Sequence, residues 1–333
     1  MRPTFSIIFF TVLSGAGYGL LFLVGASLLY APALISGFGE LASAADLDNL
    51  AARARFTVEI ALAAGALLTI AGLLSSVGHL GKPLRAWRAF SQWRSSWLSR
   101  EGVASVLTFV PVLGLLGWLL AGGDIRSSVT LLGAIVLAVL CAATVFCTAR
   151  IYSSLKPIRA WHNAHVVPGY FLFAFYTGAL WIAALYTMPF ALSPISIPVG
   201  TLYLFNAFVI APLCAVLKIG YWRSLREPPK PDAGDATGLA RLGTVRVFEA
   251  PHTEENYLTH EMGFVLARKH ARRLGTIALM LIVLAPMSIY PLSFMVGNVA
   301  PWLVVLLGML GVVVERWLFF AEARHAVIAY YGR

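Results

Sequence analysis

Two ionisable residues, His79 and Glu101, lie at the junctions between long apolar stretches of the chain. His79 is near the end of one stretch, and Glu101 directly precedes the next. Histidine titrates near neutral pH, and ionisable groups at membrane depth are costly and commonly functional. A pair of this kind could exchange protons with a quinone, because reduction of its two carbonyl oxygens consumes two protons. The structural alternative is that Glu101 interacts with the dipole of a first helical turn and that His79 caps the preceding helix.

The elements that must position this pair are membrane-spanning helices. Of the 333 residues, 59% are hydrophobic and only 12% are charged, with a mean hydropathy of +0.80. That charged share is about half of the roughly 25% of a typical soluble protein. The apolar runs are long and unbroken, whereas a membrane β-barrel would show short alternating segments. The sequence therefore predicts an all-α polytopic membrane protein built as a single membrane domain over residues 1–333.

Eight apolar stretches are long enough to cross a bilayer, which takes roughly 20 helical residues. Prolines inside several of them are expected to kink helices that pack against neighbours. The predicted spans cover approximately residues 5–35, 57–80, 102–122, 127–149, 167–190, 194–217, 275–296 and 299–320.

The distribution of basic residues predicts the orientation. Eight spans place both termini on one side, and 22 of the 25 lysines and arginines fall on that side. Arg53, Arg55 and Arg126 fall on the other. Cytoplasmic loops carry the excess of Lys and Arg, so both termini are expected in the cytoplasm. The segments between spans are then a periplasmic loop at 36–56 with a short interfacial helix at 46–55, a cytoplasmic interfacial segment at 81–101, and a cytoplasmic loop at 218–274 with a helix at about 253–273.

The sequence has no recognisable metal-binding motif. Cys141, Cys147 and Cys214 lie inside apolar runs at spacings that fit no metal or iron–sulfur motif. We therefore expect neither a cysteine-bound metal ion nor an iron–sulfur cluster in this chain. The histidines all lie in or beside cytoplasmic segments. A haem b is not expected, although His162 and His165, together with His79 or His325, could in principle hold an iron near the interface.

An adjacent acid and base, Glu315 and Arg316, lie at the end of the last apolar run. Neighbours on a helix point about 100° apart, so the two are expected to face different partners. Arg316 would either extend to the lipid head groups or line a quinone pocket.

The order of these features resembles the DmsC-type membrane anchors of complex iron–sulfur molybdoenzymes. The similar segments are Ser6–Ser14, the His79-Leu-Gly-Lys-Pro block and Ser99-Arg100-Glu101. In that family the positions of His79 and Glu101 hold the quinol-site histidine and an acidic residue. The resemblance implies proton exchange at these two residues, with a quinone pocket formed by His79, Gly81, Pro83, Arg85, Glu101 and Arg316.

Two segments, 253–273 and 315–325, are similar to a narrower branch of this family, the anchors of cytoplasmic quinone-linked sulfite-oxidising complexes. This branch implies an iron–sulfur subunit and a molybdopterin subunit on the cytoplasmic side, and ubiquinone or menaquinone as the electron acceptor. Anchors of DMSO reductases have an acid one turn before the position of Arg316, where this chain has Val312.

Four functions remain open. The first is a redox anchor that passes electrons to quinone as sulfite becomes sulfate, and the second is a quinol-oxidising anchor of a DMSO or S-oxide reductase. A secondary transporter is disfavoured because no charged residue is expected mid-span and no paired broken helices are apparent. A purely structural anchor is the fourth. The basic residues of 81–101, interleaved with tryptophans, suit anionic lipids or an acidic protein partner, and nucleic acid is not expected.

Overall fold

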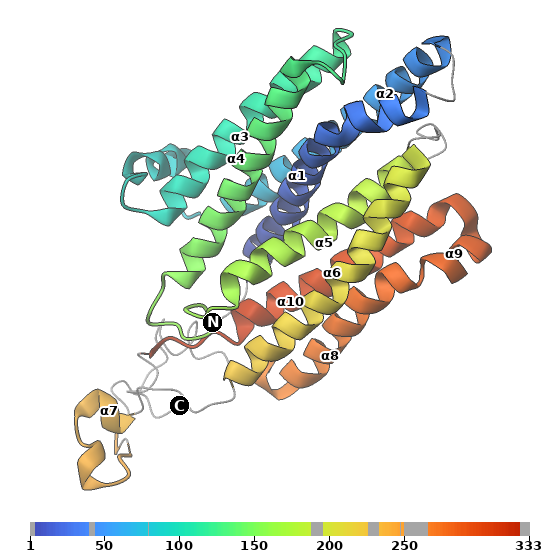
Figure 1. The fold of residues 1–333 in the computed structure, drawn as a ribbon. Helices are drawn as coiled ribbons and strands as arrows, with labels where there is room; N and C mark the ends of the chain where they lie inside the picture. Colours follow the sequence, from blue (N-terminus) through green and yellow to red (C-terminus); the bar gives the residue numbers. More distant parts are fainter. Residues whose placement is uncertain are drawn as a thin grey trace.

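The protein is a bundle of long helices, as a computed structural model shows (Figure 1). It describes residues 4–39, 44–78, 80–187, 196–225, 233–246, 248–249 and 266–326. Within these residues there is no strand, and the sole β-type pairing is an isolated bridge between Ile158 and His325. The predicted all-α class is confirmed.

Eight helices in the described part of the chain are long and apolar enough to cross a membrane, which confirms the predicted number. The protein is therefore a multi-pass membrane protein. These helices are α1 (Phe5–Gly39), α2 (Ala44–Val77), α3 (Trp97–Leu120), α4 (Ser128–Ser153), α5 (Val166–Tyr186), α6 (Ser196–Leu225), α8 (Leu266–Met287) and α10 (Ala300–Ala321).

Shorter helices connect or flank the spans. A 3-10 helix, η1 (Pro83–Gln92), joins α2 to α3, and α9 (Ile289–Val296) with η4 (Gly297–Val299) joins α8 to α10. Gly297 adopts a φ of 56°, a conformation that suits glycine at the sharp turn into α10. The small helices α7 (Ala233–Thr237) and η2 (Ala240–Leu242) follow α6.

Several elements extend beyond the bounds that hydropathy indicates. The segment predicted as a loop at 36–56 is largely helical, since α1 continues to Gly39 and the expected interfacial helix is part of α2. Helix α6 continues about two turns past residue 217. Residues 266–273 of the expected helix at 253–273 belong to α8, and the rest of it lies outside the described residues. Polar residues at helix ends lower the local hydropathy without ending the helix.

Helices α1 and α5 form the centre of the bundle, and they are the most deeply buried spans. Their backbones approach closely where two glycines face each other. A Cβ on Gly19 would overlap the carbonyl oxygen of Ala174, and one on Gly178 would overlap the backbone of Gly19. Small residues permit such contacts between membrane helices, where van der Waals packing drives association.

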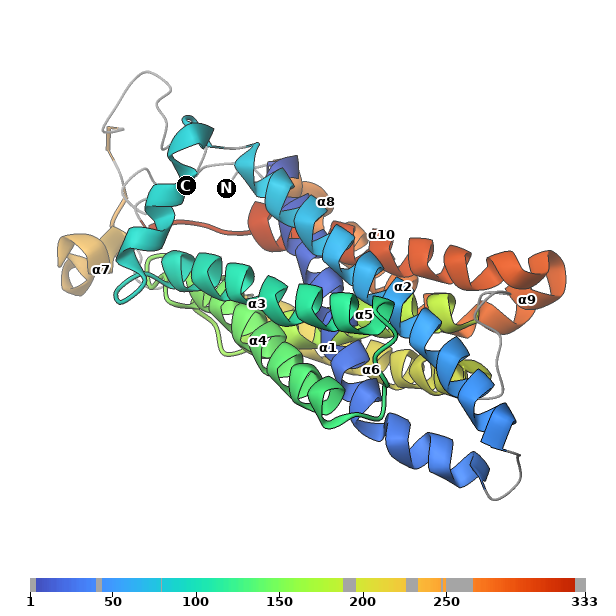
Figure 2. The same cartoon turned by 90° about the horizontal axis from the view of Figure 1, so that it is seen from above.

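One end of the bundle, called the terminus end below, is where α1 begins and α10 ends. Helices α3, α5 and α8 also begin there, and α2, α4 and α6 end there (Figures 1 and 2). Side chains near these six helix ends and the ends of α1 and α10 can therefore meet at similar depth.

Candidate functional site

Glu101 lies inside the bundle near the terminus end. It follows the first turn of α3, and only 5% of its surface is exposed. The hydroxyl of Thr148, near the end of α4, lies 2.6 Å from Glu101 Oε1 and donates a hydrogen bond to it. Among the described residues, Thr148 is the hydrogen-bond donor to this carboxyl. A buried carboxyl is costly at membrane depth, so this position favours a functional role over a dipole contact in the first turn.

Three of the other predicted pocket residues lie apart from Glu101 in the described part of the chain. His79 lies outside the described residues. Gly81, Pro83 and Arg85 are exposed at the terminus end, in and before η1. Helix η1 contacts α3 through Phe90, whose ring lies against Gly102. The structure thus places Gly81, Pro83 and Arg85 near the first residues of α3, whereas Glu101 is buried within the bundle.

A second group of buried charges lies between α6 and α10. Lys218 Nζ is 2.6 Å from Glu315 Oε1, and Arg316 Nε is 2.5 Å from Glu315 Oε2. All three side chains are at most 5% exposed. We call these residues the ionic triad. Its two cations and one carboxylate carry a formal net charge of +1.

Aromatic rings surround both cations of the triad. Lys218 Nζ lies 3.8 Å from the ring centroid of Tyr221. The guanidinium carbon of Arg316 lies 4.6 Å from the centroid of Tyr170 and within about 5 Å of Phe173 and Phe319. Cation–π contacts are strongest when the cation is desolvated, so these rings offset part of the burial cost.

The triad changes two expectations from the sequence. Arg316 does not extend to the head groups, because α10 continues to Ala321 and its guanidinium is buried against α5. Glu315 and Arg316 do face different helices, although their side chains also contact each other. Lys218 was assigned to a loop, but it lies in α6, and it pairs with Glu315 as a buried charge toward the terminus end of two spans.

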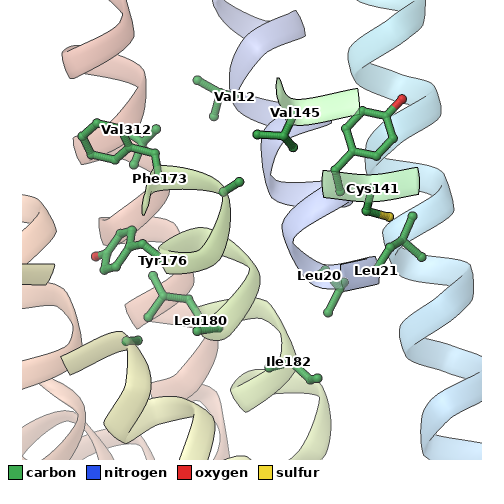
Figure 3. Close-up of a cluster of buried hydrophobic side chains, with 14 of the residues drawn as sticks. Val12, Leu20, Leu21, Cys141, Val145, Phe173, Tyr176, Leu180, Ile182 and Val312 are labelled. Atoms are coloured by element: carbon green, nitrogen blue, oxygen red, sulfur yellow. The ribbon is translucent and has the colours of Figure 1, made fainter. Parts of the chain in front are cut away.

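A small cavity lies between the surroundings of Glu101 and the ionic triad. It is lined by both Thr148, the partner of Glu101, and Arg316, and it holds about 20 Å³ of free space. Figure 3 shows Val12, Val145, Phe173 and Val312 in the apolar packing that forms its walls. Its other polar lining residues are the hydroxyl-bearing Thr11, Ser14, Tyr18, Tyr170 and Thr177.

Two of these hydroxyls, on Tyr18 and Tyr170, are buried and lack a well-formed hydrogen bond among the described residues. A cavity of this size has room for about one water molecule, which needs two to four polar partners. The hydroxyls, Thr148 and Arg316 supply them. The cavity is therefore suited to water that links the surroundings of Glu101 to those of the ionic triad.

Two of the histidines considered for haem, His162 and His165, lie in the connection between α4 and α5. His162 Nδ1 is 2.7 Å from the carbonyl oxygen of Ser153, and His165 Nδ1 is 2.7 Å from Asn163 Oδ1. The described residues contain no group of three or more His, Cys, Asp or Glu side chains placed to hold a metal ion. Among these residues, the local hydrogen bonds account for the orientation of both rings.

Arginines and tryptophans alternate on the exposed surface at the terminus end. Arg88 stacks over Trp87, Arg94 over Trp93, and Arg100 over Trp97 at 4.4 Å from the ring centroid. Leu84 and Trp87 of η1 are largely exposed. This basic and aromatic surface suits contact with lipid head groups or with a protein that docks at the terminus end.

Comparison with known proteins agrees with this architecture. The family described as DMSO reductase anchor subunit (DmsC) matches residues 1–321. The chain belongs to the DmsC family. It is 30% identical to the C subunit of the sulfite dehydrogenase of Allochromatium vinosum, over 99% of both proteins. It is also 31% identical to the C component of the anaerobic dimethyl sulfoxide reductase of Escherichia coli, over 46% of this protein and 53% of that one. No solved structure matches it significantly.

Membership of the DmsC family confirms the resemblance seen in the sequence, including its sulfite-oxidising branch. The names of the relatives describe parts of oxidoreductase complexes, which agrees with a membrane anchor rather than a self-contained enzyme. Sequence reasoning singled out Glu101, Glu315 and Arg316, which the structure shows to be buried. It did not single out Lys218, or Thr148 and Tyr170, which are among the residues that line the cavity.

Proposed function

We propose that this protein is the membrane anchor and quinone-binding subunit of a sulfite-oxidising complex. It passes electrons from an iron–sulfur subunit, supplied by a molybdopterin subunit that oxidises sulfite to sulfate, to the membrane quinone pool. The observation that carries the proposal is the buried carboxyl of Glu101 in a DmsC-family bundle. Full-length similarity to a subunit of a sulfite dehydrogenase supports the substrate.

The orientation follows from charge. In the predicted topology 22 of the 25 basic residues fall on the side of the terminus end, so the positive-inside rule assigns it to the cytoplasm of a bacterial inner membrane. The iron–sulfur and molybdopterin subunits then dock there, against the basic and aromatic surface of η1. Electrons leaving the last cluster travel a short distance to a quinone bound near Glu101.

The chemistry at the site is proton transfer coupled to electron transfer. A quinone, ubiquinone or menaquinone, takes two electrons and two protons to become the quinol. Glu101 is suited to give a proton to one carbonyl oxygen, with Thr148 fixing the orientation of its carboxyl group. We assign His79 to the second proton, and Gly81, Pro83 and Arg85 to the rim of the pocket. Arg316 lines the small cavity together with Thr148, and we assign it to the side of the pocket away from the rim.

The purified complex tests this function directly. We expect sulfite-dependent quinone reduction, lost in Glu101→Gln and His79→Ala while the complex assembles and still oxidises sulfite with a soluble dye. Sulfite-dependent quinone reduction that survives both substitutions would contradict the quinone site. A complex that uses quinol to reduce sulfoxides but ignores sulfite would support the DMSO-reductase alternative, for which the partial similarity to the Escherichia coli protein is the specific observation.

A further inference from the structure

A third acidic residue, Glu322, connects the ionic triad to the surface of the terminus end. It directly follows α10 and is half-buried. Trp222 Nε1, on α6, donates a hydrogen bond to Glu322 Oε2 at 3.0 Å. Lys218 Nζ lies 5.2 Å from the ring centroid of the same tryptophan. Glu322 therefore lies between the surface and Lys218.

Burial raises the pKa of Glu322 above the usual range of a carboxyl, and the charge of Lys218 and the hydrogen bond from Trp222 offset part of this rise. The other titratable groups that act on Glu322 are Glu315, on its own helix, and Tyr221, on α6. A raised pKa makes the protonated form of this carboxyl easier to reach than that of a fully solvated glutamate.

Polar contacts continue inward from Glu322 through the triad. Lys218 and Glu315 are in direct contact, and Arg316 joins Glu315 to the cavity. Among the described residues, the titratable side chains near Lys218 and Glu315 are Tyr170 from α5, Cys214 and Tyr221 from α6, Arg316 from α10, and Glu322 directly after α10.

From the cavity, Thr148 completes the connection to Glu101. The hydroxyls of Tyr18 and Tyr170 lie along the cavity wall, and a water molecule there has the partners it needs. Polar groups thus extend from the membrane boundary at Glu322 to the buried carboxyl of Glu101, across α10, α6, α5, α4 and α3.

We propose that Glu322, Lys218 and Glu315 form a proton-input path that supplies Glu101 from the aqueous phase at the terminus end. The proposal rests on the proposed quinone reduction. Each quinone receives two electrons from the iron–sulfur partner and two protons. Each proton that Glu101 gives to the quinone is replaced along the path, and water outside the membrane reprotonates Glu322.

The residue types in the path suit proton transfer. A lysine ammonium can release a proton, whereas an arginine side chain in a protein stays charged. When Lys218 gives its proton to Glu315, both become neutral, so the transfer moves no net charge out of the pair. Arg316 keeps its charge throughout. It holds the Glu315 carboxylate in position and orients the cavity water through its remaining N–H groups. Water beside Arg316 takes the proton from Glu315 and passes it to Glu101, and Glu322 then reprotonates Lys218.

Lysine-to-arginine substitution separates proton transfer from charge alone. In the purified complex, Lys218→Arg keeps the cation but cannot release a proton. We expect sulfite-dependent quinone reduction to fall by about tenfold or more in Lys218→Arg, Lys218→Met and Glu322→Gln. The loss should grow as pH rises, because protons become scarcer, and the solvent deuterium isotope effect should increase. Dye-linked sulfite oxidation should not change.

Glu59→Gln is the matched control, because Glu59 also pairs with a basic residue, Arg55, but in α2 and far from the triad. Its quinone reduction should equal that of the unmodified complex at every pH. An independent readout needs no turnover. The infrared band of the protonated Glu322 carboxyl, assigned by its loss in Glu322→Gln, should titrate at higher pH in Lys218→Met, because the neighbouring cation is gone.

Three results would overturn the path. The first is a rate of quinone reduction in Lys218→Arg equal to that of the unmodified complex, while Lys218→Met is slow. The second is a pH dependence of quinone reduction in Glu322→Gln equal to that of the unmodified complex. The third is an infrared band of the Glu322 carboxyl that titrates at the same pH in Lys218→Met as in the unmodified complex. Glu101→Gln distinguishes this failure from failure of the quinone site. If Glu101→Gln abolishes quinone reduction and the path variants do not slow it, the site stands and the path fails.

Discussion

Lys218 on α6 and Glu315 on α10 meet inside the bundle with their charged atoms 2.6 Å apart. Desolvating two charges is expensive, and a buried pair is often no more stabilising than apolar residues of the same volume. Its presence at this depth therefore indicates a function, or a constraint on how α6 packs against α10, rather than a gain in stability. Removing one partner has a different effect, because the other charge stays buried.

Glu315→Gln tests this asymmetry. The substitution leaves Lys218 and Arg316 buried without a carboxylate, and loss of one partner of a buried pair costs about 3–5 kcal/mol. The free energy of unfolding in mixed detergent micelles should fall by that amount. Lys218→Met combined with Glu315→Gln should recover part of the loss, since only Arg316, stacked on aromatic rings, then remains charged. A double variant less stable than the single one would contradict this.

Thr148→Val tests the hydrogen bond to Glu101. Valine has nearly the same shape as threonine, so the main change is the loss of the donor 2.6 Å from the Glu101 carboxyl. Leaving a buried polar group without its partner costs about 1–3 kcal/mol. We expect this loss in unfolding free energy together with slower quinone reduction. Thr144→Val, one turn earlier on α4, is the control, because its hydroxyl contacts Thr108 and no carboxyl.

Equal quinone reduction in the two threonine variants would show that the contact with Glu101 has no functional effect. Stability alone does not separate them, because both lose a buried hydroxyl. The rate ratio between Thr148→Val and Thr144→Val is therefore the decisive measurement.

Gly19→Ala tests the contact between α1 and α5. A Cβ at Gly19 would overlap the carbonyl of Ala174, which is backbone and cannot move aside. Overpacking of this kind costs about 1–3 kcal/mol, so the thermal midpoint should drop clearly. Gly15→Ala, one turn earlier, places its Cβ in open space and should leave the midpoint unchanged. Equal midpoints for the two variants would show that α1 and α5 can separate at little cost.

The helix number and the candidate residue Glu101 were predictable, because both depend on strong local signals. Roughly twenty apolar residues in a row leave few alternatives to a spanning helix. Glu101 was found because an acid at the start of an apolar run is unusual. The periodicity of α6 also held a signal that hydropathy averaging hides. Its buried positions Ala207, Ala211, Cys214, Lys218 and Tyr221 alternate at spacings of four and three.

That spacing is the pattern of one helix face, and Lys218 continues it. A lysine in register with a buried stripe predicts a buried cation, which in turn requires an acidic partner on another helix. The cavity beside Thr148 was not predictable in the same way. It depends on how side chains from α1, α4, α5 and α10 fill the space between helices, and no local pattern encodes that.

Glu322 predicts a specific pH dependence of stability. Its pKa is raised in the folded protein by burial, so the folded state binds more protons than the unfolded state between the two pKa values. The contribution of Glu322 to the free energy of unfolding therefore decreases as pH rises above about 4.3, the pKa of a glutamate in the unfolded chain. The unfolding free energy of the unmodified protein minus that of Glu322→Gln should decrease from about pH 4 toward neutral pH. A flat or rising difference would contradict the direction of the shift.

Cysteine labelling tests the orientation on which the proposed partner compartment depends. In a background where Cys141, Cys147 and Cys214 are replaced by alanine, a single cysteine is placed at Asp124 or at Lys156. Asp124 lies in the connection between α3 and α4, and Lys156 lies in the connection after α4, at the terminus end. By the positive-inside rule, a membrane-impermeant maleimide should label Asp124→Cys in spheroplasts and Lys156→Cys only after permeabilisation. The reverse pattern would place the terminus end in the periplasm, and with it Glu101, the basic surface of η1 and any docked iron–sulfur subunit.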